Sequence, residues 1–284
     1  MSNRFFLDYF FILPLVDLLW WVFIILIYFF KHRRLKFYQY VFSIRNYYLA
    51  VAPLLISLLV VSIMYHSLKP LFFFSLFAVA GVFGESIFSF WWDCLFDKRF
   101  WVYGVKPIFH SYSSLLNFVP WGAGGMLYLA ILEVLGMKFL NPLYHVSFFS
   151  DKPFYVIFSL GFISILIFTF VFAYLARRRK KWGFEFRKVN IANYLTFCLP
   201  ITIPLLTLSI FSAIDYFYLT VFFGFIAFIF EYLFGKFLVF FISKKFWYYT
   251  YFTFDRKHST VLIILPAAAG GFLFWTVYLL AEKL

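Results

Sequence analysis

The chain has 284 residues, of which 65% are hydrophobic and 13% are charged, with a mean hydropathy of +0.91. This composition excludes an ordinary soluble domain and predicts an all-α polytopic membrane protein. The formal net charge of +13 suits anionic lipid headgroups, and we do not expect nucleic-acid binding.

Eight apolar stretches are long enough to cross a bilayer as helices, because about 30 Å of hydrocarbon requires about 20 residues. In chain order they are 8–30, 47–67, 70–95, 114–136, 154–176, 194–213, 216–243 and 259–281. The first is too long for the apolar core of a signal peptide and has no small-residue cleavage site. We therefore expect it to remain as a membrane helix, and almost no sequence is left for a soluble domain.

Basic residues are concentrated in the loops after the first, third, fifth and seventh predicted helices. These loops carry 19 of the 25 Lys and Arg residues, and the opposite side carries five. By the positive-inside rule the basic loops are cytoplasmic and both termini lie outside. We expect the cytoplasmic membrane of a bacterium or archaeon, with membrane lipids as partners.

The sequence also matches itself at an offset of 146 positions. The offset pairs polar, aromatic and Pro positions such as Glu85 with Glu231, Trp101 with Trp247, Tyr103 with Tyr249, Ser113-Ser114 with Ser259-Thr260, and Pro120 with Pro266. This predicts a tandem duplication with two four-helix repeats, 1–146 and 147–284. Because four is an even number, the repeats are parallel and a pseudo-two-fold axis along the membrane normal relates them.

Glu85 and Glu231 are the strongest candidate functional residues, because both lie inside predicted membrane helices. A carboxylate in the bilayer must be paired, protonated or directed at a polar cavity. At helical spacing Glu85 shares one stripe with Phe88, Trp92 and Arg99. If the third and seventh helices flank the pseudo-axis, the two carboxyl groups meet at the centre. The alternative is a hydrogen bond between helices, in which a protonated Glu is bonded to a Ser or a Tyr across the interface.

A basic pair followed by Trp and Tyr comes after each of these two helices. Cations and aromatic rings suit the cytoplasmic interface, so simple anchoring is one interpretation. Because the pattern occurs twice, the other interpretation is that two basic clusters bind one anionic headgroup or pyrophosphate. Besides the two Glu residues, this predicted substrate site contains Lys98, Arg99, Trp101, Tyr103, Lys244, Lys245, Trp247 and Tyr249.

Two further features lie close to these candidates. Small residues open the fourth and eighth predicted helices, at 120–125 and 266–271. They predict close helix packing, with a broken helix that lines a site as the alternative. Lys236 follows Glu231 by about one turn, and we expect it to pair with Glu231 or to extend toward the interface.

The sequence contains no P-loop, no Gly-x-Ser-x-Gly, no Cys-x-x-Cys and no twin Asp-rich motif. Its five His residues are scattered without metal-ligand spacing. These observations argue against covalent and nucleotide-driven enzymes. We expect no cofactor and no metal.

Part of each repeat resembles a family of small bacterial membrane proteins described as type IV ABC transporters, to which vertebrate transmembrane proteins are related. The residues that carry the resemblance are Glu85, Leu95-Phe96, Arg99, Trp101, Tyr103, Pro107, Leu116 and Trp121-Gly122, then 231–235 with Trp247 and Tyr249. The match covers about 40 residues per repeat. The family's Trp–Tyr motif has an acid between the aromatic residues and a Ser after the Tyr, where this chain has Val102 and Gly104, then Tyr248 and Thr250.

A fainter similarity, through Trp92-Asp93 followed by Trp101, is to the carotenoid (lycopene) cyclases built from small tandem membrane domains. It implies an enzyme alternative. The paired acidic motif that those cyclases carry after a proline is absent from this chain.

We therefore expect a protein that binds or transports a lipidic or small anionic substrate in a central site between the repeats. The first alternative is a membrane enzyme that acts on an isoprenoid or polyene lipid by carboxylate acid–base chemistry. The second is an accessory subunit whose basic loops dock a partner. A partner subunit or a second copy of the chain is compatible with all three.

Overall fold

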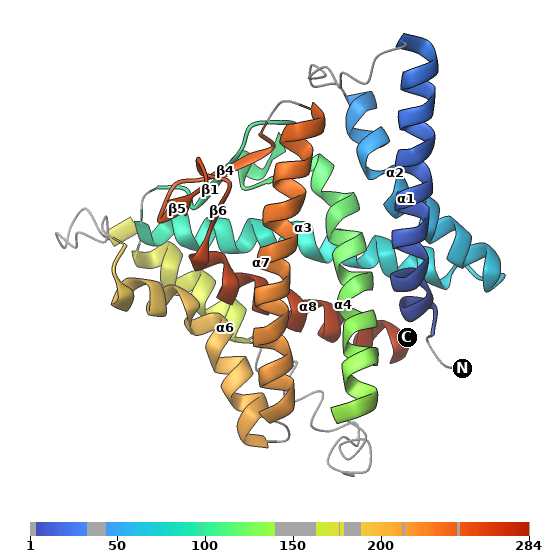
Figure 1. Ribbon diagram of the computed structural model, residues 1–284. Helices are drawn as coiled ribbons and strands as arrows, with labels where there is room; N and C mark the ends of the chain where they lie inside the picture. Colours follow the sequence, from blue (N-terminus) through green and yellow to red (C-terminus); the bar gives the residue numbers. More distant parts are fainter. Residues whose placement is uncertain are drawn as a thin grey trace.

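The computed structural model describes residues 4–32, 44–96, 98–139, 163–175, 177–178, 189–211, 214–242 and 245–283. Its long helices are α1 (Phe5–His32), α2 (Ile44–Met64), α3 (Lys69–Phe96), α4 (Phe118–Phe139), α6 (Ile191–Phe211), α7 (Ile214–Ile242) and α8 (Ile264–Lys283). In Figure 1, α3 and α8 run across the view, and α1, α4 and α7 are steeply inclined to them.

Six described helices are long and apolar enough to cross a membrane: α1, α2, α3, α4, α7 and α8. They coincide with six of the eight predicted spans. The predicted spans at 154–176 and 194–213 lie partly outside the described residues; their described parts contain the apolar helix Ile163–Leu175 and α6. Length and composition thus agree with the predicted all-α membrane protein.

Large apolar side chains point outward along these helices. On α1, for example, Phe11 is 63% and Leu18 is 62% exposed. An extended apolar surface of this kind is unfavourable in water and favourable against lipid tails. The exposed face of α1 therefore fits a membrane location.

The segments before α4 and α8 form short strands that the sequence analysis did not predict. The first contains β1 (Trp101–Tyr103), β2 (Pro107–Ile108) and β3 (Ser113–Ser114), and the second contains β4 (Trp247–Tyr249), β5 (Thr253–Phe254) and β6 (Ser259–Thr260). The pairs β2–β3 and β5–β6 are antiparallel, and β1 pairs antiparallel with β4. In Figure 1 the strands gather beside α3, near the upper end of α7.

The β1–β4 ribbon joins segments that are far apart in the chain. Its register places Trp101 opposite Tyr249, Val102 opposite Tyr248, and Tyr103 opposite Trp247. Residues opposite each other on antiparallel strands share a face. One face of the ribbon thus carries two Trp and two Tyr side chains, all buried.

Aromatic packing holds the ribbon against the helices. Trp92 near the end of α3 lies between Phe100 and Phe197, with ring centroids 4.3 Å and 4.9 Å away. Phe100 in turn contacts Tyr249 across the ribbon, at 5.5 Å. This cluster fixes the ribbon relative to α3 and α6, because aromatic pairs at these separations have preferred geometries.

Close packing explains the small residues of α4. A methyl group added to Gly122 would lie 2.6 Å from Phe74, and one added to Gly125 would lie 2.5 Å from Phe77. The prediction of close packing is confirmed there. Pro120 and Pro266 lie in the first turns of α4 and α8, which continue through both small-residue stretches. The alternative of a broken helix is therefore wrong.

Candidate functional site: two carboxyl groups beside the strand ribbon

Glu85 in α3 is 8% exposed and accepts hydrogen bonds from four side chains. The Tyr103 hydroxyl donates to Oε1. Ser113 Oγ at 2.5 Å, Asn117 Nδ2 at 3.0 Å and Trp121 Nε1 at 3.2 Å donate to Oε2. A carboxylate has about four acceptor positions, so the protein itself satisfies this group.

The segment 98–117 reaches Glu85 by folding back along α3. Glu85 lies roughly 16 Å before the end of α3 at Phe96, at 1.5 Å per residue. Within the segment, Ser114 Oγ donates to the Val105 carbonyl at 2.7 Å and accepts from the Leu116 N–H at 3.2 Å. These bonds are needed because buried polar groups must find hydrogen-bond partners within the protein.

Glu231 in α7 has a different environment. It is partly exposed and accepts a hydrogen bond from the Tyr249 hydroxyl on Oε1. The Trp247 indole lies beside Glu231, but the indole N–H makes no hydrogen bond of normal geometry with any described residue. The ribbon thus supplies Tyr103 to one carboxyl group and Tyr249 to the other.

The two carboxyl groups and the two tyrosines form one electrostatic cluster. The charges of Glu85 and Glu231 act on each other and on both phenols. Burial, followed by the adjacent carboxylate, raises the pKa of Tyr103 and of Tyr249 well above the ordinary value. Both phenols therefore keep their protons at neutral pH and donate hydrogen bonds.

The predicted site residues separate into an inner and an outer group. Trp101, Tyr103, Trp247 and Tyr249 lie with the two carboxyl groups, and the Trp101 indole donates to the Tyr112 carbonyl at 2.9 Å. The outer group is basic. The Lys98 ammonium lies 5.1 Å from the centre of the Tyr251 ring, and the Arg99 guanidinium lies 5.8 Å from the centre of the Tyr112 ring. Lys245 donates a hydrogen bond to the Arg256 carbonyl. Lys244 lies outside the described residues.

One expectation about geometry is wrong, and of the two alternatives for Lys236 the pairing with Glu231 is not formed. Arg99 does not share the helical stripe of Glu85, because α3 ends at Phe96. Lys236 pairs with Asp255 at 2.5 Å instead of with Glu231. The Lys236 ammonium, and then the Tyr232 hydroxyl at 2.6 Å, lower the pKa of Asp255 to about 2.

The sequence analysis did not identify Ser113, Asn117 and Trp121 as partners of Glu85. Ser113 carried a signal, because Ser259 stands 146 positions later. Asn117 and Trp121 carried none, because Ile263 and Ala267 stand at the corresponding positions. Their contacts depend on how the segment 98–117 folds, which the sequence pattern does not encode locally.

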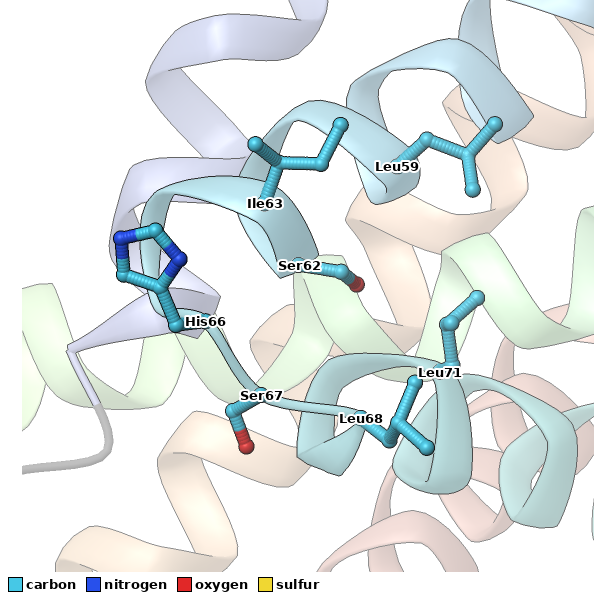
Figure 2. A pocket seen from close by; sticks show the side chains of 7 residues that line it. All are labelled: Leu59, Ser62, Ile63, His66, Ser67, Leu68 and Leu71. Carbon is cyan, nitrogen blue, oxygen red and sulfur yellow. The ribbon is translucent and has the colours of Figure 1, made fainter.

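A shallow hollow of about 350 Å³ lies elsewhere, at the turn between α2 and α3 (Figure 2). Its lining is mostly apolar and consists of Leu59, Ser62, Ile63, His66, Ser67, Leu68 and Leu71. Because this turn is at the opposite end of α3 from β1, the hollow is separate from the two carboxyl groups.

Comparisons of the chain with protein-family models, with curated proteins and with solved structures find no match. The resemblances described above therefore stay expectations, and the function must be argued from the geometry of the site.

Proposed function

We propose that the protein binds or transports a lipidic or small anionic substrate at a central membrane site beside the β1–β4 ribbon. The observation that carries this proposal is the cluster of Glu85, Glu231, Tyr103 and Tyr249 between apolar helices. Ionisable groups at membrane depth are rare and usually mark a substrate, ion or proton path. The aromatic residues around them suit an apolar ligand body.

The proposal includes eight membrane helices in two parallel repeats, 1–146 and 147–284. Recurrence of local geometry at the offset of 146 supports it. The ribbon register pairs Val102 with Tyr248 at its centre. Positive φ angles occur at three consecutive residues, 109–111, and again at 255–257. An antiparallel pair of equivalent strands is what a two-fold axis through the ribbon would produce.

In this proposal both termini lie outside and the basic loops are cytoplasmic, in accordance with the positive-inside rule. The basic residues around the ribbon then lie at the cytoplasmic mouth of the site. There Lys98, Arg99, Lys244 and Lys245 would attract an anionic group of a substrate that enters from the cytoplasm, and the carboxyl groups would bind polar atoms deeper in the site.

A second candidate is an enzyme that acts on an isoprenoid or polyene lipid. It is favoured by the different surroundings of the two carboxyl groups, because acid–base pairs use one group as donor and the other as acceptor. Among the described residues, four side chains donate to Glu85, whereas Glu231 has the Tyr249 hydroxyl and the neighbouring Trp247 indole, which supplies such a difference. Product formation from a bound polyene would distinguish this candidate from transport.

The test is native mass spectrometry of the protein purified in mild detergent, with the wild type beside the double variant Glu85→Gln/Glu231→Gln. We expect a defined adduct on the wild type that the folded double variant lacks. Its mass would separate a lipid from a polyene. Absence of an adduct from both proteins, with folding unchanged, would contradict the proposal. Sensitivity confined to changes in the loops 31–36 and 177–181 would favour the accessory-subunit alternative.

A further inference from the structure

We propose that Glu231, and not Glu85, receives the ligand, and that the ligand's polar end is the hydroxyl group of a largely apolar alcohol. This inference rests on the proposed function of the same site. It follows from three differences between the surroundings of the two carboxyl groups. Glu231 has fewer hydrogen-bond donors among the described residues, a buried Ser hydroxyl in its repeat has no partner, and its side chain is more exposed.

Glu85 already accepts about as many hydrogen bonds from the protein as a carboxyl group normally does. Tyr103 engages one oxygen, and Ser113, Asn117 and Trp121 engage the other. The Trp121 ring also fills the space next to α3, where a methyl group added to Gly81 would lie 2.6 Å from it. A ligand could reach Glu85 only by displacing protein donors, so Glu85 serves to hold the segment 98–117 against α3.

Glu231 lacks two of the corresponding donors. The positions 146 residues after Asn117 and Trp121 hold Ile263 and Ala267, whose side chains cannot donate a hydrogen bond. Replacing an indole by a methyl group also removes the ring that would cover the carboxyl group. Glu231 is accordingly the more exposed of the two.

Ser259 is the unpaired group that points to a ligand. It occupies in β6 the place that Ser113 occupies in β3, opposite Phe254 as Ser113 is opposite Ile108. Ser259 is 0% exposed, and its Oγ has no hydrogen-bond partner among the described residues. A buried hydroxyl without a partner is costly, and an external group that pairs with it removes that cost.

The atoms around Glu231 select the ligand chemistry. The Glu231 carboxyl group accepts and the Trp247 N–H donates. The Ser259 hydroxyl, which we place beside them by its correspondence with Ser113, does either. A hydroxyl group satisfies both kinds because it donates one hydrogen bond and accepts others. A phosphate or carboxylate would place an anion beside two carboxyl groups and among apolar side chains, and an ammonium group would leave the Trp247 N–H without an acceptor. Phe234, stacked with Trp247 at 6.3 Å, provides apolar surface for the rest of the molecule.

The test uses all-trans-retinol and retinyl methyl ether as matched probes that differ in the hydroxyl hydrogen. Each is titrated into the full-length protein in phosphatidylcholine vesicles, and binding is followed by energy transfer from Trp. We expect retinol to bind about tenfold more tightly than the ether, because the ether cannot donate a hydrogen bond to Glu231. Glu231→Gln should reduce this preference to roughly threefold or less.

Ser259→Ala keeps the proposal testable if Glu231→Gln fails to fold, because it deletes a hydroxyl that makes no hydrogen bond with the described residues. We expect retinol affinity to fall about two- to tenfold with an unchanged melting temperature. Ser62→Ala, which removes a buried Ser hydroxyl of α2 that donates to Leu58, serves as the control and should leave retinol affinity unchanged.

The outcomes separate the inference from the proposed function. Equal binding of retinol and the ether would overturn the assignment of the hydroxyl to Glu231 and leave an apolar binding site. The assignment would also be overturned if Glu85→Gln abolished the preference for retinol and Glu231→Gln did not. Binding of neither probe, together with no adduct in native mass spectra, would overturn the inference and the proposed function together.

Discussion

Glu85 and Glu231 lie equally far ahead of β1 and β4, and a Tyr from each strand donates to the corresponding carboxyl group. Their other neighbours differ. Asn117 and Trp121 complete the surroundings of Glu85, whereas apolar Ile263 and Ala267 stand at the corresponding places near Glu231. Two identical side chains on similar helices thus acquire different surroundings from the segments that fold onto them.

The largest expected effect is the difference in stability between Glu85→Ala and Glu231→Ala. Removing Glu85 leaves four donors without this acceptor. Three of them are buried, and each buried donor without an acceptor costs about 1–3 kcal/mol. We expect a loss of at least about 3 kcal/mol for Glu85→Ala and about half of that or less for Glu231→Ala. Thermal unfolding in detergent, followed by Trp fluorescence, measures both. Equal losses would break the comparison.

Ile263→Asn should convert the surroundings of Glu231 toward those of Glu85. The new amide would donate to the carboxylate and compete with the retinol hydroxyl, so we expect retinol affinity to fall about fivefold, corresponding to about 1 kcal/mol. Ile263→Leu is the matched control that keeps an apolar side chain. Unchanged affinity in Ile263→Asn would show that position 263 does not control access to Glu231.

The approach of α4 to α3 can be tested with two neighbouring glycines. Gly125→Ala places a methyl group against Phe77 and should cost about 1–3 kcal/mol, because the core cannot accommodate it. Gly124 has no neighbour within 4 Å of an added methyl group. Gly124→Ala should therefore stabilise α4 by about 0.5–1 kcal/mol through helix propensity. Similar melting temperatures for the two variants would argue against the close packing that holds Trp121 near Glu85.

The smallest expected effect is a dependence of folding stability on pH that arises from the segment before α8. Burial, and then Lys245, lower the pKa of His258 from its ordinary value of 6.5. Lys236 and Asp255 are the other charged groups that act on it. Below pH 6.5 the unfolded chain binds a proton that folded His258 does not, so stability falls as the pH decreases toward the folded pKa. His258→Gln should remove this part of the slope between pH 8 and pH 5.

Asp255 extends the dependence to more acidic solution. Its pKa is about 2 in the folded protein against 3.8 ordinarily, so its contribution is present above pH 3.8 and is lost as the pH falls toward 2. Lys236→Met should weaken this contribution, because Lys236 is the largest cause of the low pKa. Melting temperatures of the wild type and Lys236→Met at pH 5 and pH 2.5 measure it.

The helical class could be predicted from the sequence because a bilayer span has a simple length and composition rule. The same rule exposed Glu85 and Glu231 as exceptions inside apolar helices. The strands could not be predicted, since β1 and β4 are short and pair across a large separation in the chain. No glycine marks the positive φ angles at 109–111 and 255–257 either.

Only part of the hydrogen-bond donors of Glu85 could be predicted from the sequence. Ser113 could be suspected from its counterpart Ser259, but Asn117 and Trp121 reach Glu85 only because the segment 98–117 folds back along α3. The difference between the two carboxyl groups therefore depended on tertiary structure, even though the residues that cause it are visible in the sequence.

The most direct test of this difference is an infrared difference spectrum in the carboxyl region, recorded on adding retinol to the protein in lipid vesicles. We expect a retinol-induced band that is absent in Glu231→Gln and persists in Glu85→Gln. A band that disappears in Glu85→Gln and persists in Glu231→Gln would contradict the claim that Glu231 receives the ligand.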